Sequence, residues 1–427
     1  MQKLLEKFGV GENLKKNLFT ILIVAVGGAI IYGLPYFRYD YYDAYLKAYN
    51  LTNVQMGVFG SIYGVFGMVS YLFGGYVADR VSVKKILVYS LVGTGLGGFI
   101  HLIPNISFKT LVLLYAFWGF SSLFAFWPAC VKAVRMLSDS EGQGKAFGIF
   151  EGGRGVSAAL GASIAVIVYR IGIKGMVADE VLGMKYVIIF YSIINILCGV
   201  LVQFNMKDEI MKSNEKISFS DIGKVIKLPA VWIISIVTFC NYVFTLSLYY
   251  FVPYGTSLLG MTVTSAAILA AVKRYVSPLS NIGGGFLGDK MGTSNLLFIS
   301  FIVMALGTTG ILLLPFNGTA LVIWLFVILY IVNYLFYNVN YSLAWAMMEE
   351  GAIPDKYSGT AVGLISTIGY LPEIFISLMA GKILDKYPGA LGYRYFFGYL
   401  IAMLLLGAIF VAVWKNYLKK NNLMKSK

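Results

Sequence analysis

Apolar residues dominate the chain in runs of about 20, and short polar segments separate these runs. A helical run of this length is enough to cross the hydrocarbon core of a bilayer. Hydropathy read in windows of about 19 residues therefore predicts an all-α membrane protein with twelve membrane-spanning helices. Their predicted ranges are 18–37, 54–78, 86–104, 108–130, 146–169, 186–205, 231–254, 263–288, 295–315, 319–345, 358–383 and 394–414.

The most polar long segment, residues 206–228, divides these spans into two sets of six. The sets share sequence features: 74–85 resembles 283–295, and 141–148 resembles 355–363. An even number of spans per copy gives both copies the same orientation, so we expect parallel repeats. The predicted organisation is a cytoplasmic interfacial segment at 1–17, six-helix bundles at 18–205 and 231–414, a cytoplasmic linker at 206–230 and a basic cytoplasmic tail at 415–427.

Composition and charge exclude several function classes. The 427 residues are 59% hydrophobic and 13% charged, whereas soluble domains are about 25% charged. The net charge of +14 does not indicate nucleic-acid binding, because the lysines are spread over short loops and not gathered on one solvated face. With the N-terminus inside, 22 of the 34 Lys and Arg residues fall in cytoplasmic segments and 9 in outer ones. This bias predicts a multi-pass protein of the cell (inner) membrane with both termini in the cytoplasm.

The sequence motifs favour neither an enzyme nor a cofactor. Cys130, Cys198 and Cys240 fall in or near spans without CxxC spacing, so they predict single buried thiols and no metal site. The stretch 93–98 fits GxGxxG but lies inside a predicted span, where glycines serve helix packing. The sequence contains no P-loop, HExxH or GxSxG motif. We expect a monomer without a cofactor, whose partners are the lipid bilayer and a small molecule.

Three positive charges, Arg154, Lys273 and Arg274, fall inside predicted spans. A charge at bilayer depth is costly unless it meets protein, water or a counter-charge, so such residues mark candidate transport pathways. Lys273 and Arg274 lie roughly 15 to 22 Å along the helix from the cytoplasmic Asp289. Because adjacent helical residues point in different directions, we expect one of the two to face a cavity. Arg274 is the favoured one, since a guanidinium can bind an oxyanion with two parallel hydrogen bonds.

The stretch 75–85, GYVADRVSVKK, resembles the loop 2–3 signature of the major facilitator superfamily, and Asp289-Lys290 resembles its weaker copy between spans eight and nine. The sequence departs from that signature at Ser82 and Val83, where the family usually has glycine and a basic residue. The resemblance implies the major facilitator fold and alternating access to a central site. An ordinary basic, topology-setting loop is the alternative to a gate, and the residues predicted to gate are Asp79, Arg80 and Asp289.

A second resemblance covers spans four and five. The runs 127–132 (WPACVK), 144–148 and 152–155 are similar to the organophosphate:phosphate antiporter branch of that superfamily. Arg154 stands where members carry a substrate-contacting histidine, and Arg38 matches their arginine late in span one. Members pair this arginine with another in span seven, where this chain offers Asn241 and no charge.

Acidic and polar residues in the spans complete the candidate site. Glu151 precedes Arg154 by three residues, a spacing at which helical side chains meet. Glu373 follows a proline, and Asp40 follows Arg38. We expect these acids to couple transport; a structural ion pair is the alternative for Glu151, and bundle stabilisation is the alternative for Glu373. Polar and aromatic residues predicted to line a cavity, with interfacial tyrosines as the alternative, are Asn241, Asn333, Tyr334, Tyr337, Asn338, Tyr341 and Trp345.

The predicted function is secondary transport of a small organic anion, such as a sugar phosphate or sugar acid, with phosphate or a proton as the coupling ion. The predicted ligands of the anion include Arg38, Arg154 and Arg274, with Lys273 beside them. One alternative is a proton-coupled symporter of a neutral sugar or other solute, in which Arg38, Arg154, Lys273 and Arg274 are each matched by one of Asp40, Asp43, Glu151 and Glu373. The other is a transporter-like receptor that binds without transporting.

Overall fold

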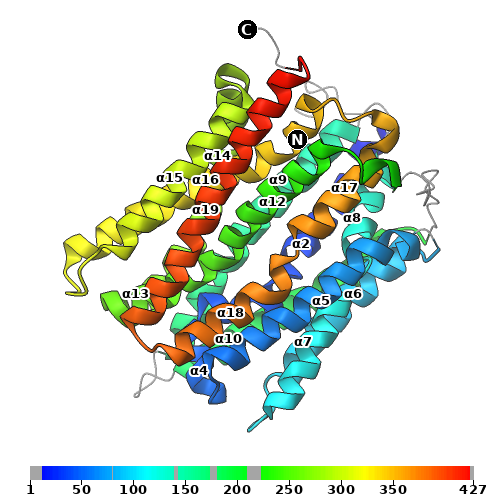
Figure 1. Ribbon diagram of the computed structural model, residues 1–427. Helices are drawn as coiled ribbons and strands as arrows, with labels where there is room; N and C mark the ends of the chain where they lie inside the picture. Colours follow the sequence, from blue (N-terminus) through cyan, green and yellow to red (C-terminus); the bar gives the residue numbers. More distant parts are fainter. Residues whose placement is uncertain (1–11, 79, 139–142, 174–179, 209–222, 424–427) are drawn as a thin grey trace. The chain divides into compact units, whose positions relative to one another are not determined.

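The computed structural model describes residues 12–78, 80–138, 143–173, 180–208 and 223–423, and every regular element in these ranges is helical (Figure 1). Most of the predicted interfacial segment, much of the predicted linker and the end of the predicted tail lie outside the described residues. The helices of the first half are α2 (Glu12–Ile30), α3 (Gly33–Asp40), α4 (Tyr42–Tyr49), α5 (Asn53–Ala78), α6 (Val83–Ile100), α7 (Phe108–Leu123), α8 (Phe126–Met136), α9 (Gln143–Ile173) and α10 (Glu180–Asn205).

The helices of the second half follow the linker. They are α12 (Pro229–Ser247), the 3₁₀ turn η2 (Leu248–Tyr250), α13 (Phe251–Leu259), α14 (Val263–Met291), α15 (Thr293–Leu312), α16 (Ala320–Glu350), α17 (Asp355–Gly369), α18 (Pro372–Lys386) and α19 (Ala390–Lys420).

These helices account for the predicted spans. Within the described residues, nine helical stretches are long and apolar enough to cross a membrane, and α2 with α3 forms a tenth as a pair bent by 45°. The predicted spans 54–78 and 263–288 coincide with α5 and α14, which are 26 and 29 residues long. At about 1.5 Å per residue, each of these two is long enough for a hydrocarbon core of about 30 Å. With them, all twelve predicted spans have a helical counterpart.

Four spans are interrupted within their length. Breaks separate α2 from α3, α7 from α8, α12 from α13 and α17 from α18. At the second break Ala125 adopts a φ of +61°, and the last break precedes Pro372, which has no backbone N–H to donate. Irregular backbone at membrane depth is tolerated where protein or a water-filled cavity surrounds it. The breaks are therefore places to look for a binding site.

Helix packing repeats in the two halves. In the first half α2 packs against α8, α9 and α10, while α6 packs against α7 and α10. In the second half α12 packs against α16, α17, α18 and α19, while α15 packs against α16 and α19. Spans one and seven thus contact corresponding partners, and so do spans three and nine. This correspondence is the arrangement that parallel six-helix repeats produce.

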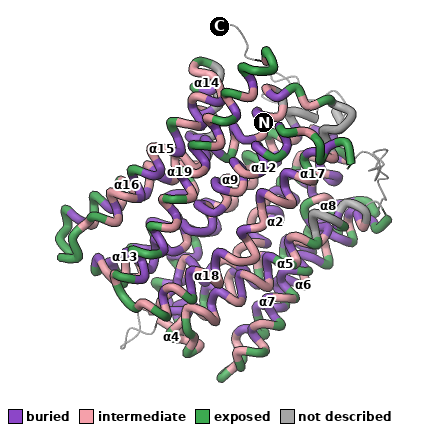
Figure 2. The backbone as a smooth tube through the Cα atoms, in the orientation of Figure 1, coloured by how far each residue is buried: buried purple, intermediate pink, exposed green. Residues whose placement is uncertain are grey.

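The chain forms two compact units. Unit 1 comprises residues 1–51 and 65–214, and unit 2 comprises 52–64 and 215–427. Helix α5 is therefore divided, with its first turns packed in unit 2. Both units expose large apolar side chains, such as Leu113, Phe204 and Leu313, and buried and exposed positions occur on every long helix (Figure 2). Such exposure is expected of helices that face lipid.

The start of α5 is fixed to α18 within unit 2. The Asp385 carboxylate accepts hydrogen bonds from the backbone N–H of Asn53 at 3.0 Å, the Asn53 side-chain amide at 2.7 Å and the backbone N–H of Val54 at 2.7 Å. These backbone groups belong to the first turn of α5 and lack intrahelical partners. Glycines let the two helices touch, because a Cβ on Gly57 or Gly381 would overlap backbone atoms of the facing helix.

Candidate functional site

Arg154 is held in the first half of α9 by contacts with two helices of unit 1. Its Nη1 donates to Glu151 Oε2 at 2.7 Å, three residues earlier on the same helix. Its Nε donates to the carbonyl oxygen of Gly28 at 3.2 Å. Gly28 lies in the last turn of α2, where carbonyls lack intrahelical donors, so the break before α3 provides this acceptor. The Arg154 side chain is 24% exposed and that of Glu151 is 51% exposed.

Aromatic rings complete the surroundings of Arg154. Its guanidinium carbon lies 4.6 Å from the ring centroid of Trp127 and 5.7 Å from that of Phe150. Trp127 is the second residue of α8, directly after the break at Ala125. A cation over an indole face is attracted by the ring quadrupole. Trp127 was singled out in the sequence only as part of the WPACVK run, and its contact with Arg154 was not predicted. The WPACVK run was nevertheless the signal that could have identified this contact.

Arg38 occupies a separate, closed setting in unit 1. It is 1% exposed, and its guanidinium carbon lies 4.2 Å from the Tyr39 ring centroid and 4.5 Å from that of Tyr115. Its Nη1 donates to the Pro35 carbonyl and its Nη2 donates to the Tyr39 hydroxyl at 3.0 Å. Within the described residues its Nε has no hydrogen-bond partner and no carboxylate pairs with it. The one-for-one matching of cations with acids therefore fails at Arg38.

A hydrogen-bonded chain extends beside Arg38. The hydroxyls of Tyr115 and Tyr45 lie 3.2 Å apart, and the Tyr45 hydroxyl lies 2.9 Å from Nε2 of His101. Helices α3, α4, α6 and α7 bring these residues together. Arg38 and Arg154 contact different residues, so the two arginines predicted to bind one anion occupy different environments in unit 1. Asp40, predicted to couple transport, is partly exposed at the last residue of α3.

The two cations of unit 2 differ in exposure. Lys273 is 6% exposed, and its Nζ lies 5.5 to 5.9 Å from the ring centroids of Tyr249, Tyr330 and Tyr334. Arg274, the next residue of α14, is partly exposed. The burial of Lys273 agrees with the expectation that the two side chains point in different directions.

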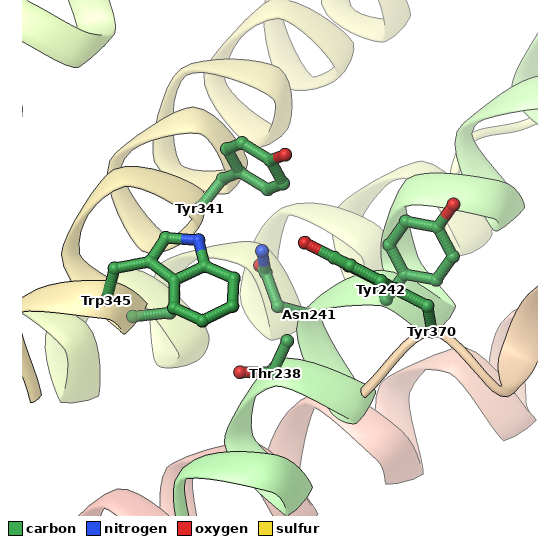
Figure 3. A pocket seen from close by; sticks show the side chains of 7 residues that line it. Thr238, Asn241, Tyr242, Tyr341, Trp345 and Tyr370 are labelled. Atoms are coloured by element: carbon green, nitrogen blue, oxygen red, sulfur yellow. The ribbon is translucent and has the colours of Figure 1, made fainter. Parts of the chain in front are cut away.

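Unit 2 also contains a small cavity among α12, α16 and the break between α17 and α18 (Figure 3). Asn241 lies between two groups of rings: Tyr341 and Trp345 are on one side, and Tyr242 and Tyr370 are on the other. The Asn241 side chain is buried, and its Oδ1 has no hydrogen-bond partner within the described residues. A buried amide oxygen without a partner is costly, so this atom is a candidate ligand contact. The residues lining the cavity are Thr238, Asn241, Tyr242, Tyr341, Ala344, Trp345 and Tyr370.

Glu373 lies beside this cavity. The Tyr242 hydroxyl donates a hydrogen bond to Glu373 Oε2, and the rings of Tyr242 and Tyr370 lie 4.6 Å apart. Glu373 is the second residue of α18, after the break that Pro372 helps to make. The acid predicted to couple transport is thus connected to the cavity through a tyrosine that the sequence did not single out.

The residues predicted on α16 have different surroundings. Tyr341 and Trp345 line the cavity. Asn338 is occupied elsewhere: its Oδ1 accepts from the Ser277 hydroxyl at 2.7 Å, and its Nδ2 donates to the Tyr334 carbonyl at 2.7 Å. Tyr337 packs between Tyr334 and Tyr341 and against Phe244. Asn338 thus links α14 to α16.

The predicted gate is only partly described. Asp79 lies outside the described residues, as does the side chain of Asp289, while Arg80 is exposed in the turn after α5. Next to this turn, Lys85 in the first turn of α6 has its Nζ 3.5 Å from Oδ2 of Asp208, which lies three residues beyond α10. The pKa of Asp208 lies below its ordinary value, because the Ser82 hydroxyl donates a hydrogen bond to its carboxylate and Lys85 is close.

The end of α5 is capped from α8. Lys132 is buried, and its Nζ donates to the carbonyl oxygen of Ala78, the last residue of α5, at 3.0 Å. A lysine at a helix C-terminus satisfies an otherwise unpaired carbonyl and complements the helix dipole. The charge of Lys132 therefore has a structural use next to the predicted gate.

Comparison with known proteins places these features in a family context. Residues 17–377 match the family model described as Major Facilitator Superfamily. The chain is 28% identical over 411 residues to inner membrane protein YqcE of Escherichia coli (strain K12), covering 94% of each chain. It is also 28% identical to inner membrane protein YihN of the same organism, covering 92% of this chain and 94% of that protein.

A more distant relative and two solved structures extend the comparison. "Probable nitrate/nitrite antiporter NarK1" of Thermus thermophilus is 25% identical over 281 residues, covering 63% of this chain and 60% of that protein. A mutant form of the nucleoside transporter NupG has a TM-score of 0.75 at 13% identity, covering 93% of this chain and 99% of NupG. A bacterial homolog of the human lysosomal transporter Spinster has a TM-score of 0.72 at 16% identity, covering 94% and 97%. These two structures share the fold.

Proposed function

The chain belongs to the Major Facilitator Superfamily and is a multi-pass membrane transporter, not an enzyme, and from this premise we propose that it moves a small organic anion by alternating access. The proposed substrate class is a sugar phosphate, a sugar acid or a similar compound with one acidic group. We also propose that it resides in the inner membrane with both termini in the cytoplasm, which the distribution of Lys and Arg over the predicted loops supports.

The single observation that carries this proposal is that Arg154 is partly exposed and has a hydrogen-bond donor that no described residue engages. Its Nε and Nη1 are each held by one oxygen, and no described residue accepts a hydrogen bond from Nη2. The side chain remains 24% exposed, in a helix that is otherwise apolar enough to cross a membrane. A fixed guanidinium with donors to spare offers an oxyanion a charge-assisted, directional contact.

Glu151 gives this site a means of coupling. In the absence of substrate its carboxylate satisfies part of the Arg154 charge. An incoming anion competes with that carboxylate for the same guanidinium, and a proton taken up by Glu151 removes the competitor. Anion and proton then bind together, which is symport; exchange against phosphate would instead replace one anion by another on an unprotonated site. A net charge left without a partner resists closure of the site, which ties movement to occupancy.

The name of one relative supports an anionic substrate. NarK1 is named for nitrate and nitrite, which are small oxyanions, although it aligns with only 63% of this chain. The resemblance of the WPACVK run and of Arg154 to the organophosphate:phosphate antiporters points to larger organic anions. We therefore place phosphorylated sugars and sugar acids first among candidates, and inorganic oxyanions second.

A ligand-binding screen tests this proposal. Purified protein is heated with sugar phosphates, sugar acids, nitrate or inorganic phosphate, since a bound ligand raises the unfolding temperature by mass action. We expect at least one anion to raise it in the wild type and in Arg170→Ala, which removes an exposed arginine from the same helix. Arg154→Ala should unfold at a similar temperature without ligand and lose the shift. An equal shift in Arg154→Ala would remove Arg154 from the site.

One observation favours a second candidate function, symport of a neutral solute with a proton. The cavity around Asn241 is lined by tyrosines and a tryptophan, and no Lys or Arg is among the described residues that line it. Aromatic rings and an unpaired amide suit an uncharged ring compound with hydroxyl groups. Glu373, hydrogen-bonded to Tyr242, would carry the proton. This candidate predicts that Glu373→Gln abolishes proton-driven uptake while Arg154→Ala leaves it unchanged.

A further inference from the structure

One surface of unit 2 is unrelated to either candidate site. A shallow groove runs along α18 and ends just beyond its last residue, and we call it the α18 groove. Its first half is apolar, and its second half carries Lys382 and Lys386, which are both exposed and lie one helical turn apart. The residues lining it are Phe375, Leu378, Met379, Lys382, Ile383, Lys386 and Tyr387.

Most of the groove lies on a face of α18 that its closest helix contacts leave uncovered; at its apolar end Phe375 stacks on Phe239 of α12, with ring centroids 6.1 Å apart. Ser377, Gly381 and Asp385, spaced by four residues, meet the start of α5. Ile376, Ala380 and Leu384 form a second row and are buried, and α18 packs against α12 and α19. At about 100° per residue, the lysines and Met379 fall on the side that neither row covers. A helix face that its own unit leaves uncovered in this way is a surface that lipid can occupy.

The positive charges of the groove are available to a ligand. Within the described residues, neither Lys382 nor Lys386 forms an ion pair. Asp385, the acid between them, is occupied by three hydrogen bonds from α5. Lys386 Nζ lies 5.3 Å from the ring centroid of Tyr387, and that ring lies 4.8 Å from the ring of Tyr395. Paired tyrosines at a helix end mark the boundary between the apolar core and the headgroups.

The groove changes from apolar to positively charged along its length, as a phospholipid changes from acyl chain to phosphate. Apolar side chains occupy the part of the helix toward the membrane interior, and the two ammonium groups stand where a headgroup phosphate would lie. No carboxylate is among the described residues that line the groove, so its charge is complementary to an anion. We propose that the α18 groove binds one anionic phospholipid, with an acyl chain along Phe375 and Met379 and its phosphate between Lys382 and Lys386.

The test compares lipids of one chain length that differ in headgroup charge. The full-length protein is purified in a neutral detergent, and phosphatidylglycerol or phosphatidylcholine is added while bound lipid is counted by native mass spectrometry. We expect the wild type to retain phosphatidylglycerol in preference to phosphatidylcholine. The double variant K382Q/K386Q should lose about tenfold in affinity for phosphatidylglycerol and bind phosphatidylcholine as before.

Matched variants keep the result interpretable. K415Q/K419Q removes two lysines that are also one turn apart, at the end of α19, and should behave as the wild type. K382R/K386R retains both charges and should keep the preference, whether or not the glutamine variant folds well. The proposal is overturned if K382R/K386R loses the preference, if K382Q/K386Q retains it, or if glycerol phosphate without acyl chains displaces the lipid at equal concentration.

Discussion

The guanidinium of Arg154 lies 4.6 Å from the centroid of the Trp127 indole ring, although the two residues belong to different helices. The break at Ala125, with its positive φ, sets the direction in which α8 begins and so places this ring. A ring at this distance attracts the guanidinium through its quadrupole and so helps to hold Arg154 beside α8.

Trp127→Ala should therefore weaken anion binding without removing it. A cation–π contact at a partly exposed site is worth about 0.5 to 2 kcal/mol, which corresponds to a loss of about 2- to 30-fold in affinity. Trp127→Phe should lose less, since it keeps a ring face. The dissociation constant of the best anion from the thermal screen measures this. Trp324→Ala, at an exposed position of α16, is the control, and an equal loss in both variants would contradict a role for the indole.

Glu151→Gln should increase anion affinity by up to about fivefold, because a solvent-exposed ion pair is worth about 0.2 to 1 kcal/mol and its removal frees Arg154. If Glu151 carries the proton, uptake by this variant should no longer respond to a proton gradient. Binding by titration and uptake with and without a pH difference measure the two effects. Lower affinity together with a lower unfolding temperature would show instead that the pair is structural.

Asp385→Asn should loosen the start of α5. The carboxylate holds the backbone N–H groups of Asn53 and Val54, and an amide oxygen can replace it only in part. Loss of a charged cap at a helix N-terminus costs about 1 kcal/mol. Hydrogen exchange measured by mass spectrometry should become faster in peptides that contain these two residues and stay unchanged in α9. Unchanged exchange at Asn53 would contradict the capping role.

Gly57→Val should destabilise the contact between α5 and α18 by about 1 to 3 kcal/mol, because the added carbons would overlap the backbone around Ser377. Gly398→Val on α19 is the matched control, since nothing lies within 4 Å of a Cβ built there. Thermal unfolding of both variants in the same detergent makes the comparison. Equal melting temperatures would mean that the helices do not approach each other closely at Gly57.

The fold was predictable from the sequence because lipid imposes a simple requirement. Each span must be apolar and long enough, and residues such as Leu113 and Phe204 meet that need wherever they point toward lipid. The geometry of the breaks was harder to predict. A proline stands within the first three residues after each break, at Pro35, Pro128, Pro253 and Pro372, but the positive φ of Ala125 has no signature in its residue type, so the direction of the helix that follows is not given by the sequence. The candidate site depends on those breaks, so its geometry could not be predicted with the spans.

The surroundings of single residues were the least predictable part. Arg38 and Arg154 have the same chemistry in the sequence, but tyrosines from α3 and α7 close around Arg38 and leave Arg154 accessible. Asn241 and Asn338 are both buried amides, and only the contact with Ser277 distinguishes the satisfied one. Tyr39 is adjacent to Arg38 in the chain, but Tyr115 is far from Arg38 and Ser277 is far from Asn338, and a single sequence does not relate such distant residues. The Arg154–Glu151 pair was predictable because its spacing is local.

Counterflow in proteoliposomes tests the proposed transport of an organic anion most directly. Vesicles containing the protein are loaded with an unlabelled sugar phosphate or sugar acid and diluted into the same labelled compound; a neutral sugar serves as the parallel substrate. We predict transient accumulation of the labelled anion by the wild type and by Arg170→Ala, none by Arg154→Ala, and none of the neutral sugar by any of them. Accumulation of only the neutral sugar, unaffected by Arg154→Ala, would contradict the anion site at Arg154.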